Sequence, residues 1–344
     1  MADLVVLEEV SLASHTTLKV GGTARYFITA STEIAVAEAV QFAKERQLPL
    51  FVLGAGSNVL APDGEYQGVV LNIRILGREA DVDPETGIVT FTVGAGEDLD
   101  TVIADTVERG WWGMENLSAI PSSIGAVPVQ NVGAYGVEAS QLIAQVRVLN
   151  GRTGAIETWT REQCQFAYRD SIFKHEAGSQ AIVLAVTFTL TTAPALQLRY
   201  KDLADYFAEA SPSQREVRNA VIAIRNKKFP DWRLIGTAGS FFKNPIIDAD
   251  EAARLKQQYP DLPVYDTTDT DKKKVSLGFI LDKICQLKGY CEEGVCLYSE
   301  QALVLTVVPG TNVKAVTHFA KTISEKVFDA TNISIEWEVV LLSK

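Results

Sequence analysis

The feature that most constrains the fold is a glycine-rich turn that occurs twice, each time directly after an apolar run. Residues 48–53 are typical of a buried strand, and Gly54-Ala55-Gly56-Ser57-Asn58 follows at once. Residues 89–93 are typical of a second strand, and Gly94-Ala95-Gly96 takes the equivalent place. A helix predicted over residues 31–46 precedes the first strand, and another follows the second turn. The repetition predicts α/β units.

The turns have two readings. Bare glycines let successive backbone N–H groups approach and surround an anion such as a pyrophosphate. The same residues also serve a tight connection from a strand to a loop. Neither turn fits GxGxxG or GxxxxGK[ST], so the sequence argues against Rossmann and P-loop sites.

Hydrophobic periodicity predicts the remaining elements. The apolar stripes of the two helices are Ile34, Ala37, Val40 and Ala43, and Leu99, Val102, Ile103, Thr106 and Val107, with Gly110 as the C-terminal cap of the second helix. Asn150-Gly151 predicts a hairpin, and residues 181–190 a further strand. Ser213 and Glu216 form a capping box before a helix that ends near Phe229-Pro230. Later elements are predicted at residues 277–287 (helix), 302–307 (strand), 312–328 (helix) and 334–342 (strand).

Composition indicates a soluble globular protein of two or three modules. The 344 residues are 47% hydrophobic, which is enough for a substantial core. With 43 acidic and 32 basic residues the net charge is −11, and no basic stripe indicates a nucleic-acid partner. No segment resembles a membrane helix or a signal peptide, so a cytoplasmic location is expected.

The cysteines and histidines give no sign of a metal site. They form no CxxC pair and no HExxH spacing, so no metal is expected. Cys285, Cys291 and Cys296 surround an apolar helix and are expected to be buried structural thiols without a function. No function is predicted for Cys164 either.

The most informative stretch is residues 116–126, Asn-Leu-Ser-Ala-Ile-Pro-Ser-Ser-Ile-Gly-Ala. It alternates small and apolar residues with few charges, so we expect it to be covered by other groups. Gln130-Asn131-Val132-Gly133-Ala134-Tyr135-Gly136 follows it. Together the two runs closely resemble the flavin segment of the UDP-N-acetylenolpyruvoylglucosamine reductases.

The resemblance extends over nearly the whole chain. It includes the runs at residues 18–22, 168–174 (Tyr-Arg-Asp-Ser-Ile-Phe-Lys), 239–245 (Gly-Ser-Phe-Phe-Lys-Asn-Pro) and 335–338. It implies an α+β protein with a PCMH-type FAD-binding region of two subdomains and a smaller α/β domain for the UDP-sugar. The boundaries we expect are 1–78, 79–228 together with the C-terminal strand 332–344, and 229–331.

The resemblance also implies the chemistry. NADPH reduces FAD, and a hydride then passes from flavin N5 to the vinyl carbon C3 of an enolpyruvyl UDP-sugar, a step of peptidoglycan precursor synthesis. Arg169 and Glu338 match the residues that stabilise the charge developing at C2. Glu338 is expected to act by hydrogen bonding, in protonated form, because a charged carboxylate beside an enolate would be repulsive. Ser240 matches the general acid that protonates C2, although its neighbourhood also fits a loop cap.

The remaining family positions bind the cofactor and the substrate. The cofactor positions are Gly54, Ala55, Gly56, Ser57, Asn58, Ser122, Ser123, Gly125, Gly133 and Arg225, and the substrate positions are Tyr168, Tyr200, Lys228, Asn244 and Gln301. Three of these have plain structural alternatives: Arg225 and Lys228 as helix-end cations, and Tyr168 as a core aromatic. Tyr200 resembles the mobile loop tyrosine of the longer subtype, which predicts a lid.

Some positions depart from the family pattern, and two other functions remain open. Val340 stands where a basic residue is frequent, Trp337 where proline is commoner, Thr16 where asparagine is frequent, and Ser122 where glycine often occurs. One alternative is another PCMH-type flavin oxidase or dehydrogenase. The other is a nucleotide-sugar binding module without a redox cofactor. The chain is expected to be a monomer.

Overall fold

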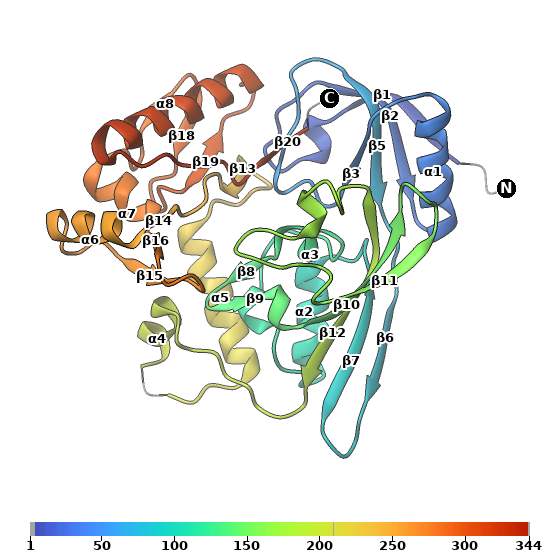
Figure 1. The fold of residues 1–344 in the computed structure, drawn as a ribbon, viewed down its shortest axis with the longest axis horizontal. Coiled ribbons are helices and arrows are strands. Elements are labelled where there is room, and N and C mark those ends of the chain that lie inside the picture. The colour runs from blue at the N-terminus through green and yellow to red at the C-terminus, as the bar shows by residue number, and fades with distance from the viewer. Residues whose placement is uncertain (1–3, 209, 343–344) are drawn as a thin grey trace.

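The first sheet is built from the N-terminal part of the chain. The computed structural model describes residues 4–208 and 210–342 (Figure 1). The strand order is β1 (Val6–Ser11), β2 (Thr23–Ala30), β5 (Tyr66–Ile73) and β3 (Leu50–Leu53). β2, β5 and β3 are parallel, and α1 (Glu33–Glu45) connects β2 to β3. The predicted strand and helix are confirmed here.

The buried face of α1 differs from the predicted stripe. Val36, Ala39, Val40 and Ala43 are buried, whereas Ile34 is 68% exposed. Two faces of this alanine-rich helix satisfy the same 3.6-residue period. Packing against β2 and β5 selects one of them, and the sequence alone does not specify that direction.

The second sheet is antiparallel and contains the predicted hairpin. Its strands in order are β11 (Ile156–Thr160), β10 (Ile143–Asn150), β12 (Ala181–Thr191), β7 (Ile88–Gly94) and β6 (Arg78–Val82). The helices beside it are α2 (Leu99–Glu108), α3 (Ala126–Gln130), α4 (Lys201–Phe207) and α5 (Gln214–Lys228). The predicted capping box at Ser213 and Glu216 begins α5. Short strands β8 (Gly133–Ala134) and β9 (Val137–Glu138) lie between α3 and β10.

One hydrophobic core runs through both sheets. The cluster extends from Ile28 on β2, through Phe91 and Ile103, to Leu190 on β12. The chain therefore shows no break in its core at residues 78–79. The division of this part into two subdomains at residues 78–79 therefore stays a prediction.

A third unit forms the upper left of Figure 1. One sheet has the order β13 (Gly236–Ser240), β19 (Val304–Val307), β18 (Val295–Leu297) and β17 (Cys291–Glu292), and a second has β14 (Ile246–Asp248), β16 (Lys272–Val275) and β15 (Val264–Asp266). Its helices are α6 (Ala249–Gln258), α7 (Leu277–Phe279) and α8 (Val313–Thr331). The helix predicted at 277–287 is reduced to α7 and a π-turn, because Cys285 N donates to Ile280 O at 2.8 Å.

The C-terminal segment joins a different unit from the one predicted. Only Val340–Leu341 (β20) forms a strand, and it pairs in parallel with β4 (Val59–Leu60). The segment therefore adds to the first unit and not to residues 79–228. Leu342 is buried in a cluster with Leu12 and Phe27, which explains why so short a strand holds its place.

The cysteines also differ from the prediction. Cys291 and Cys296 lie opposite each other on the β17–β18 hairpin and form a disulfide. Cys291 is exposed and Cys285 only half-buried, so the expectation of three buried thiols was wrong. The hairpin register, which a helical reading of this region misses, places the two sulfurs side by side. Among the described residues no helix is long and apolar enough to cross a membrane.

Candidate functional site

Three small-residue turns meet between the two sheets. Gly125 N donates to Ala95 O at 2.8 Å, which joins the loop before α3 to the turn after β7. A Cβ at Gly54 would overlap Ser123 Oγ, which brings the turn after β3 against the same loop. Gly56 has φ +68°, and a Cβ there would overlap His15 O. Glycine is therefore required at position 56, and the contacts bring the three turns together in one cradle.

The cradle contains buried polar atoms without a protein partner. Ser123 Oγ and Thr16 Oγ1 are both buried and have no hydrogen bond among the described residues. Such atoms are costly unless a ligand or water completes them. Ser122 and Ser123 are both about 95% buried, so their hydroxyls are not ordinary surface groups. Glycine turns and free hydroxyls fit a phosphorylated cofactor.

Arg225 reaches this region from α5. Its Nε donates to Ala119 O at 3.2 Å, and its Cζ lies 4.6 Å from the centre of the Phe229 ring. Burial lowers the pKa of Arg225, partly offset by Tyr135 and Asp100. Arg225 is thus engaged with the loop before α3 and is not a freely solvated charge at the end of α5, and its part in cofactor binding stays a prediction.

Arg169 and Glu338 are brought together from distant parts of the chain. Arg169 Nε lies 2.7 Å from Glu338 Oε1, and both side chains are largely shielded from solvent. Arg169 Nη2 donates to Gly133 O at 3.0 Å, and Gln130 Nε2 lies 3.3 Å from the same Glu338 oxygen. Arg169 therefore bridges Glu338 and the loop after α3.

The main chain around this pair is also fixed. Arg169 has φ +53°, in the left-handed region, and Lys174 Nζ donates to its carbonyl at 2.7 Å. Burial, followed by the charge of Lys243, lowers the pKa of Lys174. Asn58 Nδ2 donates to Glu338 O at 3.0 Å. The amide of Asn58, predicted to bind cofactor, is thus engaged in holding the segment of Glu338.

Ser240 lies on the strand that runs beside Glu338. It ends β13, and the next residue, Phe241, accepts a hydrogen bond from Glu338 N at 2.8 Å. Ser240 is half-buried, and its Oγ makes no hydrogen bond to the described part of the chain. The strand of Ser240 is thus joined to the segment of Glu338 through the main chain, and the role of Ser240 as proton donor stays a prediction.

Several predicted substrate residues form a connected group. Asn244 Nδ2 lies 3.4 Å from Tyr168 Oη, and Asn244 Oδ1 accepts from Leu277 N at 3.0 Å. Gln301 approaches the same turn, because a Cβ at Gly278 would lie 3.2 Å from its Oε1. Tyr168 is therefore part of this polar group and not a core aromatic.

Tyr200 lies at the start of α4, and Lys228, the last residue of α5, contacts that helix. Tyr200 precedes the helix, and Lys228 Nζ lies 2.5 Å from Asp202 Oδ2. Burial raises the pKa of Tyr200 to about 12, with smaller contributions from Asp202 and Tyr265. Lys228 is thus paired with a carboxylate in this structure and is not a solvated cation at the helix end.

Lys274 and Tyr265 lie beside the predicted substrate residue Tyr168 and were missed from the sequence. Lys274 Nζ lies 4.7 Å from the centre of the Tyr168 ring and 5.6 Å from that of Tyr265. Burial lowers the pKa of Lys274, whereas its neighbour Lys273 forms an ion pair with Asp266. The alternation of β16 was the available signal, since only alternate lysines of a strand share a face.

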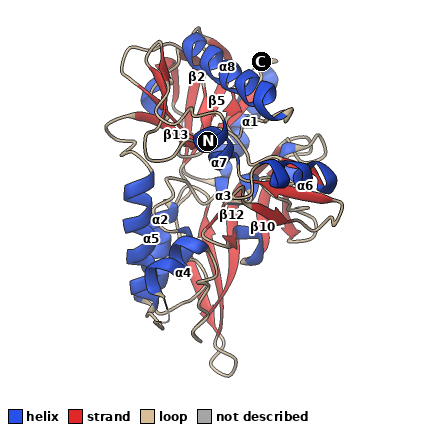
Figure 2. Ribbon diagram, turned by 90° about the vertical axis from the view of Figure 1, so that its left-hand side faces the viewer, coloured by secondary structure: helices blue, strands red, loops and turns tan. Residues whose placement is uncertain are grey.

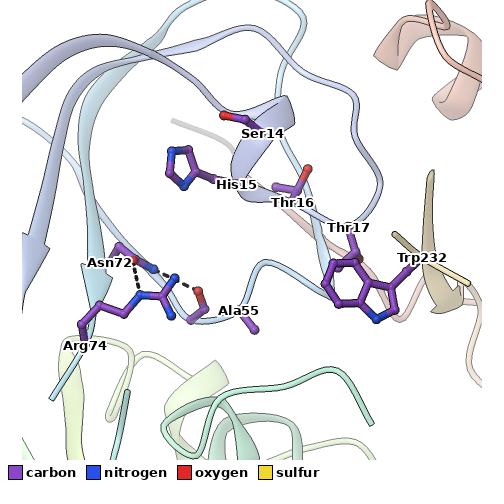
Figure 3. Close-up of a pocket in the computed structure, with 9 residues that line it drawn as sticks. Ser14, His15, Thr16, Thr17, Ala55, Asn72, Arg74 and Trp232 are labelled. Atoms are coloured by element: carbon purple, nitrogen blue, oxygen red, sulfur yellow. Dashed lines mark hydrogen bonds between the residues drawn. The ribbon is translucent and has the colours of Figure 1, made fainter. Parts of the chain in front are cut away.

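A cavity lies beside the cradle and was not predicted as such. Its volume is about 140 Å³, and Thr16, Ala55, Arg74 and Trp232 are among its lining residues (Figure 3). In the sequence, Thr16 stands out only as a departure from the family pattern. Nothing in the sequence places Trp232 next to residues more than 150 positions earlier. No cluster of three His, Cys, Asp or Glu suited to a metal occurs within the described ranges.

Comparison with known proteins decides the family. Residues 24–160 match an FAD binding domain, and residues 230–342 match the C-terminal domain of UDP-N-acetylenolpyruvoylglucosamine reductase. The UDP-N-acetylenolpyruvoylglucosamine reductase of Pseudomonas aeruginosa is 37% identical over 338 residues, which cover 97% of this chain and 98% of the relative. That of Neisseria gonorrhoeae is 36% identical over 331 residues, 95% of this chain and 94% of the relative.

The chain belongs to the UDP-N-acetylenolpyruvoylglucosamine reductase family.

Membership of this reductase family confirms several predictions. The chain is an FAD-dependent oxidoreductase with a PCMH-type FAD-binding region and a smaller α/β domain. The crystal structure of the Thermus caldophilus reductase has the same fold, with a TM-score of 0.69 and 23% identity over 99% of this chain and 100% of that one. The binding module without a redox cofactor is therefore wrong. The roles of individual site residues and the tyrosine-loop subtype stay predictions.

Proposed function

We propose that this protein reduces UDP-N-acetyl-3-O-(1-carboxyvinyl)-glucosamine to UDP-N-acetylmuramate, in the cytoplasm, with NADPH as the reductant. The observation that carries the proposal is the meeting of Arg169, Glu338 and the Ser240 strand beside the flavin cradle. A cation, a carboxylate and a free hydroxyl are the groups that this reduction requires. A simple oxidase of the same fold would not need this combination.

The cofactor would be held by the cradle. Gly54, Gly56 and Gly125 leave room for close approach, and Ser123 Oγ and Thr16 Oγ1 are available as partners. When bound, FAD supplies the hydride equivalent taken from NADPH. The donor set contains hydroxyls and backbone amides and no metal ligands, which suits a phosphate-bearing cofactor.

The reacting end of the substrate would lie against Arg169. The guanidinium presents planar donors to the substrate carboxylate, and it stabilises the negative charge that delocalises from C2 as C3 receives the hydride. Glu338, whose Oε1 lies 2.7 Å from Arg169 Nε, would act at the same point by hydrogen bonding. Lys174 keeps the Arg169 backbone in the left-handed conformation that aims the side chain at this point.

Ser240 completes the reaction. Its O–H bond breaks as the new C–H bond forms at C2, and the serine oxygen recovers a proton from solvent. The UDP group would extend from there along Tyr168, Asn244 and Gln301 toward Lys228 and Tyr200. A general acid of this kind is suited to a strongly basic carbanion-like enolate.

The test is an anaerobic visible spectrum with sequential additions. NADPH should bleach the flavin of the purified protein, and the UDP-linked enolpyruvyl sugar should restore its colour. NADH and a UDP-sugar without the enolpyruvyl ether are the matched controls. Bleaching that the enolpyruvyl sugar does not reverse would reject the substrate and leave the flavoenzyme intact.

A further inference from the structure

The disulfide of the third unit lies on a hairpin at the edge of its sheet. β17 and β18 are joined by the turn Glu293-Gly294, whose φ angles of +48° and +80° are those of a tight two-residue hairpin. In this register Cys291 lies directly opposite Cys296, and the two sulfurs are bonded. Among the described strands β17 has β18 as its one neighbour. The disulfide therefore fastens the outermost strand of the sheet to the next.

One sulfur of this pair belongs to an exposed residue. Cys291 lies at the surface, whereas Cys296 on the inner strand is partly buried. An external thiolate exchanges with a disulfide by direct attack on one sulfur, so access to that sulfur limits the rate. The two cysteines are separated by 5 positions, and a cross-link over so short a loop restricts the unfolded chain least. The bond is thus accessible and weakly supported by chain entropy.

The third cysteine of this region differs from the pair. Cys285 is half-buried directly after the π-turn, and its Sγ lies 3.9 Å from Lys326 O on α8. Burial raises the pKa of Cys285, partly offset by the charge of Lys326. A thiol that is mostly protonated is a poor attacking group. Exchange at the pair therefore requires a thiol from outside the chain.

The strand that the disulfide fastens also contacts α8. The Tyr290 ring stacks on Phe319 with 5.8 Å between ring centres, and Tyr290 Oη lies 3.1 Å from Glu292 Oε2. Tyr290 O accepts from Leu297 N at 2.9 Å. Without the disulfide, β17 would keep only these contacts and its short pairing with β18. β18 itself stays paired with β19 on its other side, so the loosening would be confined to the edge.

We propose that Cys291 and Cys296 form a reversible thiol–disulfide site, a modification site for thiol reductants, and that its reduction releases β17 from α8. A first thiolate attacks Cys291 Sγ, forms a mixed disulfide and releases Cys296 as a thiolate, which takes a proton. A second thiol attacks the reductant's sulfur in the mixed disulfide and releases Cys291, which also takes a proton. The protein gains two electrons and the reductant becomes a disulfide. The inference rests on the cytoplasmic location in the proposed function, because disulfides in reducing compartments are usually transient.

The test counts thiols in the full chain after equilibration with defined ratios of reduced to oxidised glutathione. Samples are quenched with acid, alkylated after denaturation and measured by intact mass spectrometry. The wild type should pass from two labelled cysteines, Cys164 and Cys285, to four between the ratio of an oxidising compartment and that of the cytosol. Cys285→Ser should show the same transition with one label fewer. Cys296→Ser should form a mixed disulfide with glutathione faster than Cys291→Ser, because it leaves the exposed thiol.

Hydrogen exchange measures the structural consequence. The reduced wild type should exchange faster than the oxidised protein across residues 290–297, with no change around Arg169 and with an unchanged circular dichroism spectrum. A pair that stays oxidised at the most reducing ratio is a structural disulfide, and one that stays reduced at the most oxidising ratio forms no bond. Either result, or equal exchange at residues 290–297 in the two states, overturns the proposal. None of these measurements uses NADPH or the enolpyruvyl sugar, so failure of the proposed function would be distinguishable.

Discussion

At the scale of single residues, the site depends on a few side chains whose partners are far away in sequence. Glu338 contacts Arg169 and Gln130 through its carboxylate, while its backbone is held by Asn58 and Phe241. Residues from all three units therefore fix one side chain. Small displacements in any unit would change the distance between the Arg169–Glu338 pair and Ser240, the proposed proton donor.

Ser240→Ala tests the assignment of the proton donor. Because the change removes only the hydroxyl, reduction of FAD by NADPH should stay near the wild-type rate. Reoxidation of the flavin by the enolpyruvyl sugar should slow by about two to four orders of magnitude. Stopped-flow measurement of the two half-reactions separates these effects.

Ser240→Cys is the matched variant, since it keeps a transferable proton, and it should retain more of the second half-reaction than alanine does. Equal loss in both half-reactions of Ser240→Ala would show that Ser240 supports flavin binding and does not donate the proton.

At the scale of elements, α2 and α5 are joined by a bidentate ion pair beside the cofactor loop. Arg218 Nη1 and Nη2 lie 2.6 Å and 3.0 Å from the two carboxylate oxygens of Asp100. Asp100 also accepts from Ala119 N at 2.6 Å, where φ is +60°. The pair therefore stabilises both the helix contact and the conformation of the loop.

Asp100→Asn should lower the free energy of unfolding by about 1–2 kcal/mol at pH 7. Burial alone would raise the pKa of Asp100, but the hydrogen bonds from Arg218 and Ala119 outweigh it and lower the pKa below 3.8. The contribution is thus complete above pH 3.8 and is lost as the pH falls through the folded value. Urea unfolding at pH 7, 5 and 3 measures it.

Glu108→Gln is the control, in an exposed carboxylate of the same helix. It should have little effect at any pH. A difference between Asp100→Asn and wild type that stays constant down to pH 3 would contradict the ion-pair explanation.

At the scale of the whole molecule, the proposed substrate residues come from separate elements: Asn244 and Gln301 from the third unit, Tyr200 from the start of α4 and Lys228 from the end of α5. Figure 2 shows α4 next to α5, on the side of the molecule away from the first sheet. Asp202 on α4 pairs with Lys228 on α5 in this structure. A diphosphate at Lys228 would have to replace that carboxylate, so binding and the position of α4 are coupled.

Asp202→Asn should therefore tighten binding of UDP by about two- to fivefold, since it removes a competing, partly exposed ion pair. Isothermal titration calorimetry measures the affinity, and Asp205→Asn on an exposed position of α4 is the control. Limited proteolysis should show UDP-dependent cleavage around α4 in the wild type. Weaker UDP binding by Asp202→Asn would mean that Asp202 orients Lys228 for the ligand and does not compete with it.

The sequence by itself determined the α/β units, the glycine turns, the capping box of α5 and the family, because each depends on local spacing or on runs of adjacent residues. The candidate catalytic residues followed from the family runs, although their roles await experiment. Periodicity could not choose between two faces of α1, and a helical reading hid the hairpin disulfide of Cys291 and Cys296.

Only the tertiary structure decided which distant segments meet. The C-terminal strand pairs with β4, and Arg169 contacts Glu338. Lys228 forms an ion pair with Asp202, and Trp232 lines the same cavity as Thr16. These contacts join residues that lie tens to hundreds of positions apart. Local propensity carries no information about these contacts, because they form only when separate units of the chain pack against each other.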